Sequence, residues 1–123
     1  MIHLVDGSSK TVPSPHYQSA MIGDVVRYCE TKQILGVDTE TEGFDFTTKK
    51  MIMFQIGDAD QQFVIDTRRV SIEPLRNILQ NKNILKIFHN AKFDYKFIKK
   101  WSNIVCEGIY DTYLVERVLH CGS

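Results

Sequence analysis

The feature that most constrains this sequence is a short apolar run that leads directly into two carboxylates. Ile34, Leu35 and Val37 predict a buried strand. Asp38 and Glu40 lie two positions apart, so on a strand their side chains point to the same face. Neighbouring acids repel each other unless a positive group lies between them, and oxygen ligands on one face suit a hard cation such as Mg²⁺ or Mn²⁺. The same spacing fits a strand that ends in a solvated acidic turn, so the rest of the chain has to distinguish the two.

Length, charge and cysteine usage limit the class of protein. The sequence has 123 residues, which suits a single domain with one hydrophobic core. The formal net charge is zero, so no overall field draws the chain to nucleic acid or membrane, and a nucleic-acid site would be a local patch. Three cysteines without a Cys-x-x-Cys pair, no apolar run of transmembrane length and no signal-like N-terminus predict a reduced, cytoplasmic setting without a membrane partner.

Hydrophobic periodicity and turn residues predict an α/β fold. Five strands are expected at 34–39, 50–56, 62–65, 84–88 and 104–106, with a further edge strand at 2–5 and an extended segment at 11–16. Helices are expected over 19–31, 71–80, 90–101 and 111–119, with Ser71, Asn90 and Asp111 as capping residues. Hairpin-like strands followed by strands that alternate with helices imply a mixed sheet with flanking helices.

The predicted helix at 90–101 carries a second group of polar side chains. Asn90 and Asp94 are four positions apart and share one helix face, while Phe93, Phe97 and Trp101 form an apolar row for packing on the sheet. The helix is also the most basic segment of the chain, with Lys92, Lys96, Lys99 and Lys100. It is either an ordinary amphipathic helix with a solvated lysine face, or the carrier of a third carboxylate aimed at the pocket of the first two, with lysines for phosphate.

Two motifs in this order resemble a known enzyme family. Residues 37–41 (Val-Asp-Thr-Glu-Thr) and 89–94 (His-Asn-Ala-Lys-Phe-Asp) are similar to the first two motifs of the DEDD superfamily of 3′–5′ exonucleases. The proofreading domains of family A DNA polymerases are closest by pattern, with ribonuclease D as the neighbouring group. Residues 110–116 resemble the Asp-Thr helix start that follows in these domains. The resemblance implies an RNase H-like sheet with the acids at its centre, in a single exonuclease-like domain over residues 1–123.

The resemblance implies a metal-dependent hydrolysis of phosphodiester bonds at DNA 3′ ends that releases nucleoside monophosphates. Asp38 would bridge two divalent cations, Mg²⁺ or Mn²⁺, while Glu40 binds the water-activating ion and Asp94 holds the second. These three carboxylates are the predicted catalytic and metal-binding residues. RNA in place of DNA stays open, because nothing in the sequence reports a preference for the 2′-hydroxyl.

Four further residues match positions that contact the substrate strand in the family. Phe44 would stack on the terminal base, Thr41 and Asn90 would contact sugar and phosphate, and His89 would contact the strand. Each also has an ordinary structural explanation. Phe44 fits a core or turn-packing ring, Thr41 a strand-end hydroxyl, Asn90 a helix cap and His89 a structural side chain.

The third family motif, Tyr-x-x-x-Asp or His-x-x-x-x-Asp, is not found after Asp94. Tyr95, Tyr110 and Tyr113 are followed four positions later by residues other than Asp, and His120 by none. Three explanations follow: a domain that is incomplete at its C-terminus, a partner chain or second copy that supplies the fourth carboxylate, or a catalytically impaired nucleic-acid-binding or assembly module. An incomplete domain would leave part of the sheet uncovered, which predicts an exposed apolar patch and self-association.

Overall fold

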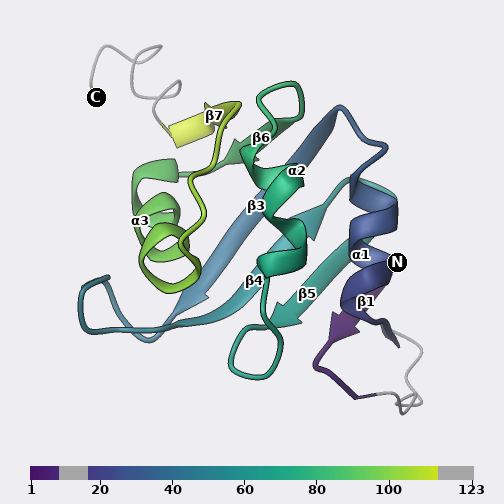
Figure 1. The fold of residues 1–123 in the computed structure, drawn as a ribbon, viewed down its shortest axis with the longest axis horizontal. Coiled ribbons are helices and arrows are strands. Elements are labelled where there is room, and N and C mark those ends of the chain that lie inside the picture. The colour runs from purple at the N-terminus through teal and green to yellow at the C-terminus, as the bar shows by residue number, and fades with distance from the viewer. Residues whose placement is uncertain (9–16, 114–123) are drawn as a thin grey trace.

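The computed structural model describes residues 1–8 and 17–113. Within these residues the chain forms one mixed sheet in the order β2-β1-β5-β4-β3-β6-β7 (Figure 1). The seven strands are β1 (Ile2–Val5), β2 (Tyr17–Ser19), β3 (Ile34–Thr41), β4 (Met51–Gly57), β5 (Gln62–Asp66), β6 (Leu85–Phe88) and β7 (Ile109–Asp111). The α/β class predicted from the sequence is confirmed.

The sheet is mixed, with three antiparallel strands flanked on both sides by parallel strands. β3, β4 and β5 form an antiparallel meander, in which β4 and β5 are joined by a short turn. β6 and β7 add to the other side of β3 as parallel strands, and β1 lies parallel to both β2 and β5. β3 therefore lies inside the sheet with a partner on each side, and its pairing with β4 shifts register between Glu40 and Thr41.

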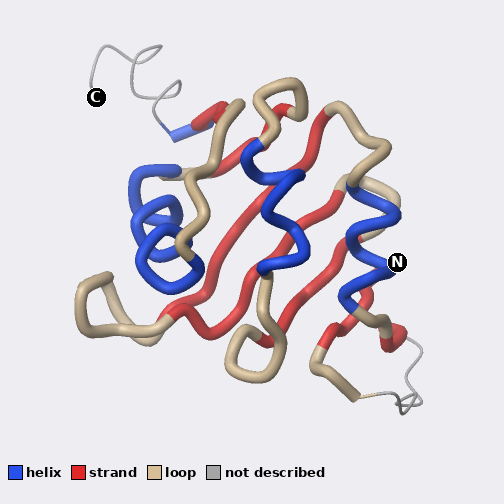
Figure 2. Tube along the Cα trace, in the orientation of Figure 1, coloured by secondary structure: helices blue, strands red, loops and turns tan. Residues whose placement is uncertain are grey.

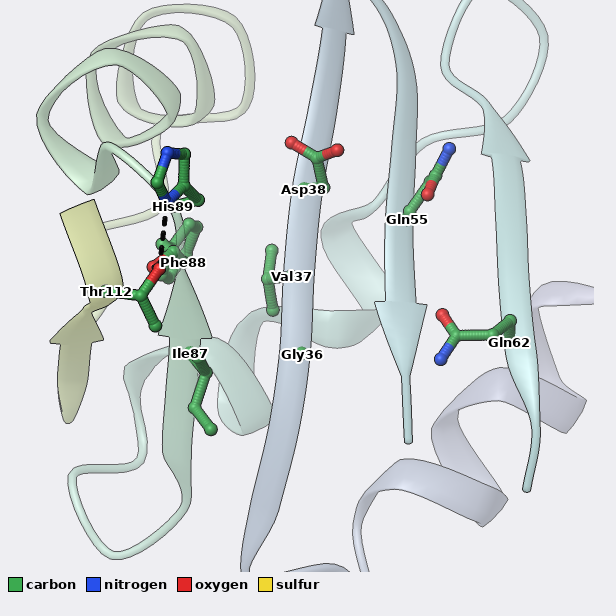
Figure 3. Close-up of a pocket in the computed structure, with 9 residues that line it drawn as sticks. All are labelled: Gly36, Val37, Asp38, Gln55, Gln62, Ile87, Phe88, His89 and Thr112. Carbon is green, nitrogen blue, oxygen red and sulfur yellow. Dashed lines mark hydrogen bonds between the residues drawn. The ribbon is translucent and has the colours of Figure 1, made fainter. Parts of the chain in front are cut away.

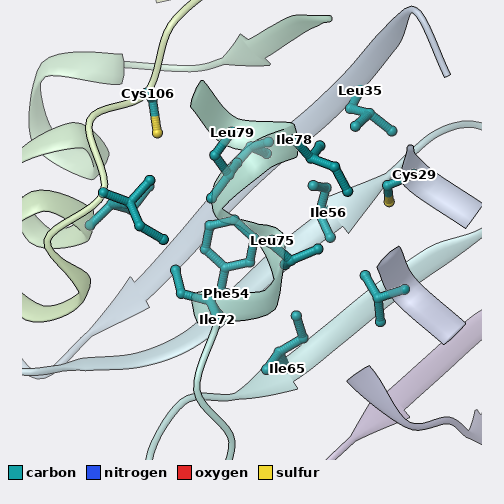
Figure 4. Close-up of a cluster of buried hydrophobic side chains, with 14 of the residues drawn as sticks. Cys29, Leu35, Phe54, Ile56, Ile65, Ile72, Leu75, Ile78, Leu79 and Cys106 are labelled. Atoms are coloured by element: carbon teal, nitrogen blue, oxygen red, sulfur yellow. The ribbon is translucent and has the colours of Figure 1, made fainter. Parts of the chain in front are cut away.

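Helices cover one face of the sheet, here called the helical face (Figures 1 and 2). They are α1 (Ile22–Cys29), the 3₁₀ turn η1 (Glu73–Leu75) with α2 (Arg76–Gln80), and α3 (Ala91–Ser102). Their apolar side chains pack on alternate residues of the strands. Figure 4 shows Phe54 and Ile56 of β4 beneath Leu75 and Leu79. This cluster is the hydrophobic core.

One lysine is buried in this core. Lys86 of β6 has no exposed surface, and its Nζ donates hydrogen bonds to the backbone oxygens of Ile78 (2.9 Å) and Asn81 (2.6 Å). Burial lowers the pKa of Lys86. The ammonium group satisfies carbonyls at the C-terminal end of α2, where a helix has unpaired acceptors and attracts cations.

The opposite face carries the acidic pair and is here called the open face. Along β3, Leu35, Val37 and Thr39 are buried while Asp38 and Glu40 are exposed. Among the described residues no helix covers the open face, and three large apolar side chains that the strand register places on it are exposed. These are Ile2, Ile34 and Tyr110. An exposed apolar surface was expected for an incompletely covered sheet, whereas self-association stays a prediction.

The predicted number of five strands is wrong, since the described residues form seven. The strand expected at 104–106 is instead a loop, and β7 follows it at Ile109–Asp111. Ile104 and Cys106 are buried, which produced the strand-like pattern, but the chain turns at Gly108 (φ +68°) before it pairs with β6. A side chain at this glycine would lie 2.8 Å from the Ile84 carbonyl.

Two other boundaries differ from the predictions for local reasons. The strand β2 was not predicted, and α1 begins at Ile22 because Asp24 accepts a hydrogen bond from the Met21 N–H (2.8 Å). Ser71 does not cap α2. Its hydroxyl accepts from the N–H of Glu73 (3.0 Å), the first residue of the 3₁₀ turn that precedes α2. The extended segment expected at 11–16 and most of the helix expected at 111–119 lie outside the described residues.

Within the described part of the chain, no helix has both the length and the apolar character needed to cross a membrane.

Candidate active site

The acidic pair lies near the C-terminal end of β3, on the open face. Asp38 and Glu40 are both exposed, which confirms that they share one face of the strand. Asp38 is opposite Gln55 in the register with β4, and Glu40 is opposite Met53. The Asp38 carboxylate accepts a hydrogen bond from the Thr39 N–H (2.9 Å). The local backbone therefore orients this carboxylate while it remains open to solvent.

The third predicted carboxylate lies on the other side of the strand. Asp94 on α3 is only 3% exposed and accepts a hydrogen bond from the Thr39 hydroxyl, which points to the helical face. Burial raises the pKa of Asp94 to about 6. The bond from Thr39 opposes this rise, and the nearby carboxylates of Asp38 and Asp111 add to it. Thus Asp94 is close enough to sense the charge of Asp38, yet its carboxylate is engaged with Thr39.

A divalent cation needs several oxygen ligands that converge on one point. Among the described residues, no group of three or more His, Cys, Asp or Glu side chains converges in this way. Asp38 and Glu40 fit such an ion in donor chemistry and in sharing an exposed face. Asp94 does not join them in this arrangement. The described residues therefore provide part of a metal site, and the metal-binding role of all three residues stays a prediction.

The start of α3 is held by an acid that is distant in the sequence. Asn90 has a left-handed backbone (φ +64°) and its side chain makes no capping hydrogen bond. Instead, the Asp111 carboxylate at the end of β7 accepts from the N–H groups of Asn90 (2.9 Å) and Ala91 (2.9 Å). It also accepts from the Tyr113 N–H (3.0 Å), while its predicted role as cap of a helix at 111–119 stays a prediction, because most of that segment lies outside the described residues. The Asn90 side chain is consequently not used as a cap.

His89 lies beside a cavity of about 430 Å³ that opens next to Asp38 (Figure 3). Its Nδ1 is 3.0 Å from the Thr112 hydroxyl, which donates to the Phe88 carbonyl (3.1 Å). The cavity brings together polar side chains from β3, β4 and β5, from the residue after β6 and from the segment after β7. Sequence reasoning found Asp38 and His89 but missed Gln55, Gln62 and Thr112, which also line it. The sequence carried no signal for these residues, because the position of Gln55 opposite Asp38 depends on the register between β3 and β4.

The two remaining predicted residues lie at and after the end of β3. Phe44 is 89% exposed, so it is not a core residue, and its ring meets Phe93 edge-on with centroids 5.7 Å apart. The Thr41 hydroxyl donates to the Gly43 carbonyl (2.8 Å) and so supports the turn. The contacts of both residues with a substrate stay predictions.

The chain is an α/β protein with a mixed sheet. Two acids on an inner strand, with a helix that begins nearby, form a candidate hydrolytic centre. The family comparison is more specific. A model of the 3′–5′ exonuclease family matches residues 16–123, and the chain therefore belongs to this family. The family predicted from the two motifs is confirmed.

Relatives with names support the same grouping. The chain is 25% identical to ribonuclease D of Nitrobacter hamburgensis over 92 residues, which are 73% of this chain and 24% of that protein. Its fold is similar to Brucella melitensis NrnC with bound Mg²⁺ (TM-score 0.71, 19% identity, 99% of this chain and 54% of that one). It is also similar to Trypanosoma brucei RNase D in complex with RNA (TM-score 0.70, 15% identity, 89% and 37%). The chain thus spans about a quarter to half of the length of these relatives.

Proposed function

We propose that this chain provides the strand-binding and metal-binding part of a 3′–5′ exonuclease that removes nucleoside monophosphates from single-stranded 3′ ends. The observation that carries the proposal is the exposed pair Asp38 and Glu40 on a central strand, within the stretch that matches the family. We include in this proposal that the sheet is RNase H-like. The similarity of its fold to solved exonuclease structures supports this.

In this proposal Asp38, Glu40 and Asp94 hold two divalent cations, Mg²⁺ or Mn²⁺. Such ions lower the pKa of a bound water and stabilise charge on the leaving oxygen. The described residues present Asp38 and Glu40 on one face of β3, and the Thr39 hydroxyl holds the Asp94 carboxylate on the other side of that strand. The fourth carboxylate comes from outside the described residues, either from a longer form of the domain or from a partner chain.

The substrate proposed from the sequence is DNA, and RNA is the second candidate. One specific observation favours RNA, because the named relatives include a ribonuclease D and a structure of RNase D with RNA. Competition between unlabelled DNA and RNA strands of equal length for one labelled strand distinguishes them. If the RNA strand inhibits cleavage of the labelled strand more strongly than the DNA strand does, RNA replaces DNA as the proposed substrate.

The test is cleavage of a 5′-labelled single strand in the presence of Mn²⁺, with products resolved by length. The wild type is expected to shorten the strand slowly and stepwise from its 3′ end, because the described residues supply only three of the four carboxylates. Asp38→Ala is expected to lose this activity by on the order of a hundredfold or more. Asp60→Ala is the matched control, because Asp60 is exposed in the β4–β5 turn. Equal activity in wild type and Asp38→Ala would contradict the catalytic role. A wild type that binds the strand without shortening it would favour a nucleic-acid-binding or assembly module.

A further inference from the structure

A second cavity, of about 390 Å³, lies between α3 and the loop that joins β3 to β4. It is distinct from the cavity beside Asp38, with which it shares no lining residue. Aromatic rings and ammonium groups form most of its wall. The residues used below are Phe44, Phe46, Phe93, Phe97, Lys92 and Lys96.

Three of these rings form a row from the core to the solvent. Phe97 is fully buried, Phe93 is half-buried and Phe44 is 89% exposed. The centroids of Phe97 and Phe93 are 5.0 Å apart, and those of Phe93 and Phe44 are 5.7 Å apart at an interplanar angle of 63°. Phe97 is fixed in the core, and the rings packed on it are held in place at the cavity. A ligand that binds there therefore costs these side chains little conformational freedom.

Phe46 lies on the loop side of the cavity and is paired with a lysine. The Lys96 Nζ is 5.4 Å from the centre of the Phe46 ring, and both side chains are half-buried. No described acidic residue forms an ion pair with Lys92 or Lys96. The cavity's acid, Asp45, accepts from the N–H (3.0 Å) and the hydroxyl (2.5 Å) of Thr47, so its carboxylate is engaged within the loop.

We propose that Phe46 and Lys96 form a second nucleotide subsite next to Phe44, with a base against the Phe46 ring and a backbone phosphate at the Lys96 ammonium. Aromatic rings bind bases of any sequence because every base has a π-face, and lysines that form no ion pair with a described acid complement the charge of phosphate. A single nucleotide can contact both side chains because they adjoin each other. The choice of a nucleic-acid strand as ligand rests on the proposed function, but the subsite itself needs no catalysis.

The test is binding of a 5′-fluorescein-labelled oligothymidylate of about eight nucleotides, followed by fluorescence anisotropy in EDTA at several salt concentrations. Phe46→Ala is expected to weaken binding on the order of tenfold with an unchanged salt dependence. Lys96→Gln is expected to reduce the slope of log K against log salt by about 0.7, which is one phosphate contact on a single strand.

Matched variants separate the subsite from general effects. Phe46→Tyr keeps a ring and is expected to bind like wild type. Lys82→Gln removes an equal charge from the α2–β6 loop, which does not line the cavity, and is expected to leave the slope unchanged. Thermal unfolding checks that every variant is folded.

The proposal is overturned if the wild type does not bind the oligothymidylate, or if Phe46→Ala and Lys96→Gln bind it with wild-type affinity and slope. Because EDTA removes divalent ions, a chain that fails the cleavage test can still show this subsite. Conversely, an active exonuclease with no effect of either substitution would reject the subsite alone.

Discussion

Asp94 shows how one residue can oppose stability. Its carboxyl has an ordinary pKa of 3.8, and burial raises the pKa in the folded protein to about 6. Below about pH 4 the group is protonated in both states. Between about pH 4 and 6 the unfolded chain releases the proton first, so the folded state loses stability as the pH rises, and the loss is complete above about pH 6. An ionised, buried Asp94 is thus a cost to the metal-free protein at neutral pH.

Asp94→Asn is expected to raise the free energy of unfolding of the metal-free protein by about 1–3 kcal/mol at pH 7, with little change at pH 4. The asparagine keeps one oxygen acceptor for the Thr39 hydroxyl, and it replaces the other carboxylate oxygen with an uncharged NH₂ group. Urea unfolding in EDTA at the two pH values measures the difference. A stability change that is equal at both pH values would show that the charge of Asp94 is not its origin.

Among single residues, sequence periodicity predicted some positions and missed others. The two-residue period of a strand placed Asp38 and Glu40 on one face, whereas the sequence left a core position for Phe44 open, which its exposure excludes. The partner of Asp94 could not be predicted, because a bond to Thr39 depends on how α3 packs against β3. Side chains alternate between the two faces of a strand, so Thr39 lies on the face opposite Asp38 and Glu40.

At the scale of elements, α3 depends on a contact with β7. Its first N–H groups bond to Asp111, which is 20 and 21 positions away in sequence. Sequence reasoning assigned the cap to Asn90 because this residue directly precedes the helix and asparagine is a favoured cap. Asp111 can cap α3 only because β7 pairs with β6. The sequence had predicted the last strand too early, at 104–106.

Asp111→Ala is expected to lower the free energy of unfolding by about 1–2 kcal/mol, because it removes the acceptor for the N–H groups of Asn90 and Ala91 at the start of α3. Asn90→Gly is the comparison. It is expected to be close to neutral, since glycine tolerates the left-handed backbone and the Asn90 side chain makes no capping bond. Urea unfolding of both variants measures the difference. A larger cost for Asn90→Gly than for Asp111→Ala would return the cap to Asn90.

At the scale of the whole molecule, the site lies on the face of the sheet that the described helices leave open. The core residues of all the helices pack on the helical face, whereas Asp38 and Glu40 point away from them. The α/β class and the central acidic strand could be predicted because local patterns specify them. The number of strands could not, since β2 and β7 are each three residues long and carry too little pattern to be recognised.

The open face also sets how tightly the chain can hold a metal ion. Two carboxylates supply fewer ligands than a hard cation prefers, so binding to this chain is expected to be weaker than in a site with the full set of acids. It should nevertheless depend on Asp38, because the like charges of Asp38 and Glu40 favour a cation between them.

Binding of Mn²⁺ to the acidic pair of β3 can be measured by titrating the chain with Mn²⁺ and following the free ion by electron paramagnetic resonance. The wild type and the Asp60→Asn control are expected to bind Mn²⁺ with the same weak affinity, and Asp38→Asn is expected to lose this binding. Equal Mn²⁺ binding by wild type and Asp38→Asn would contradict the assignment of the β3 acidic pair as the metal site of an exonuclease.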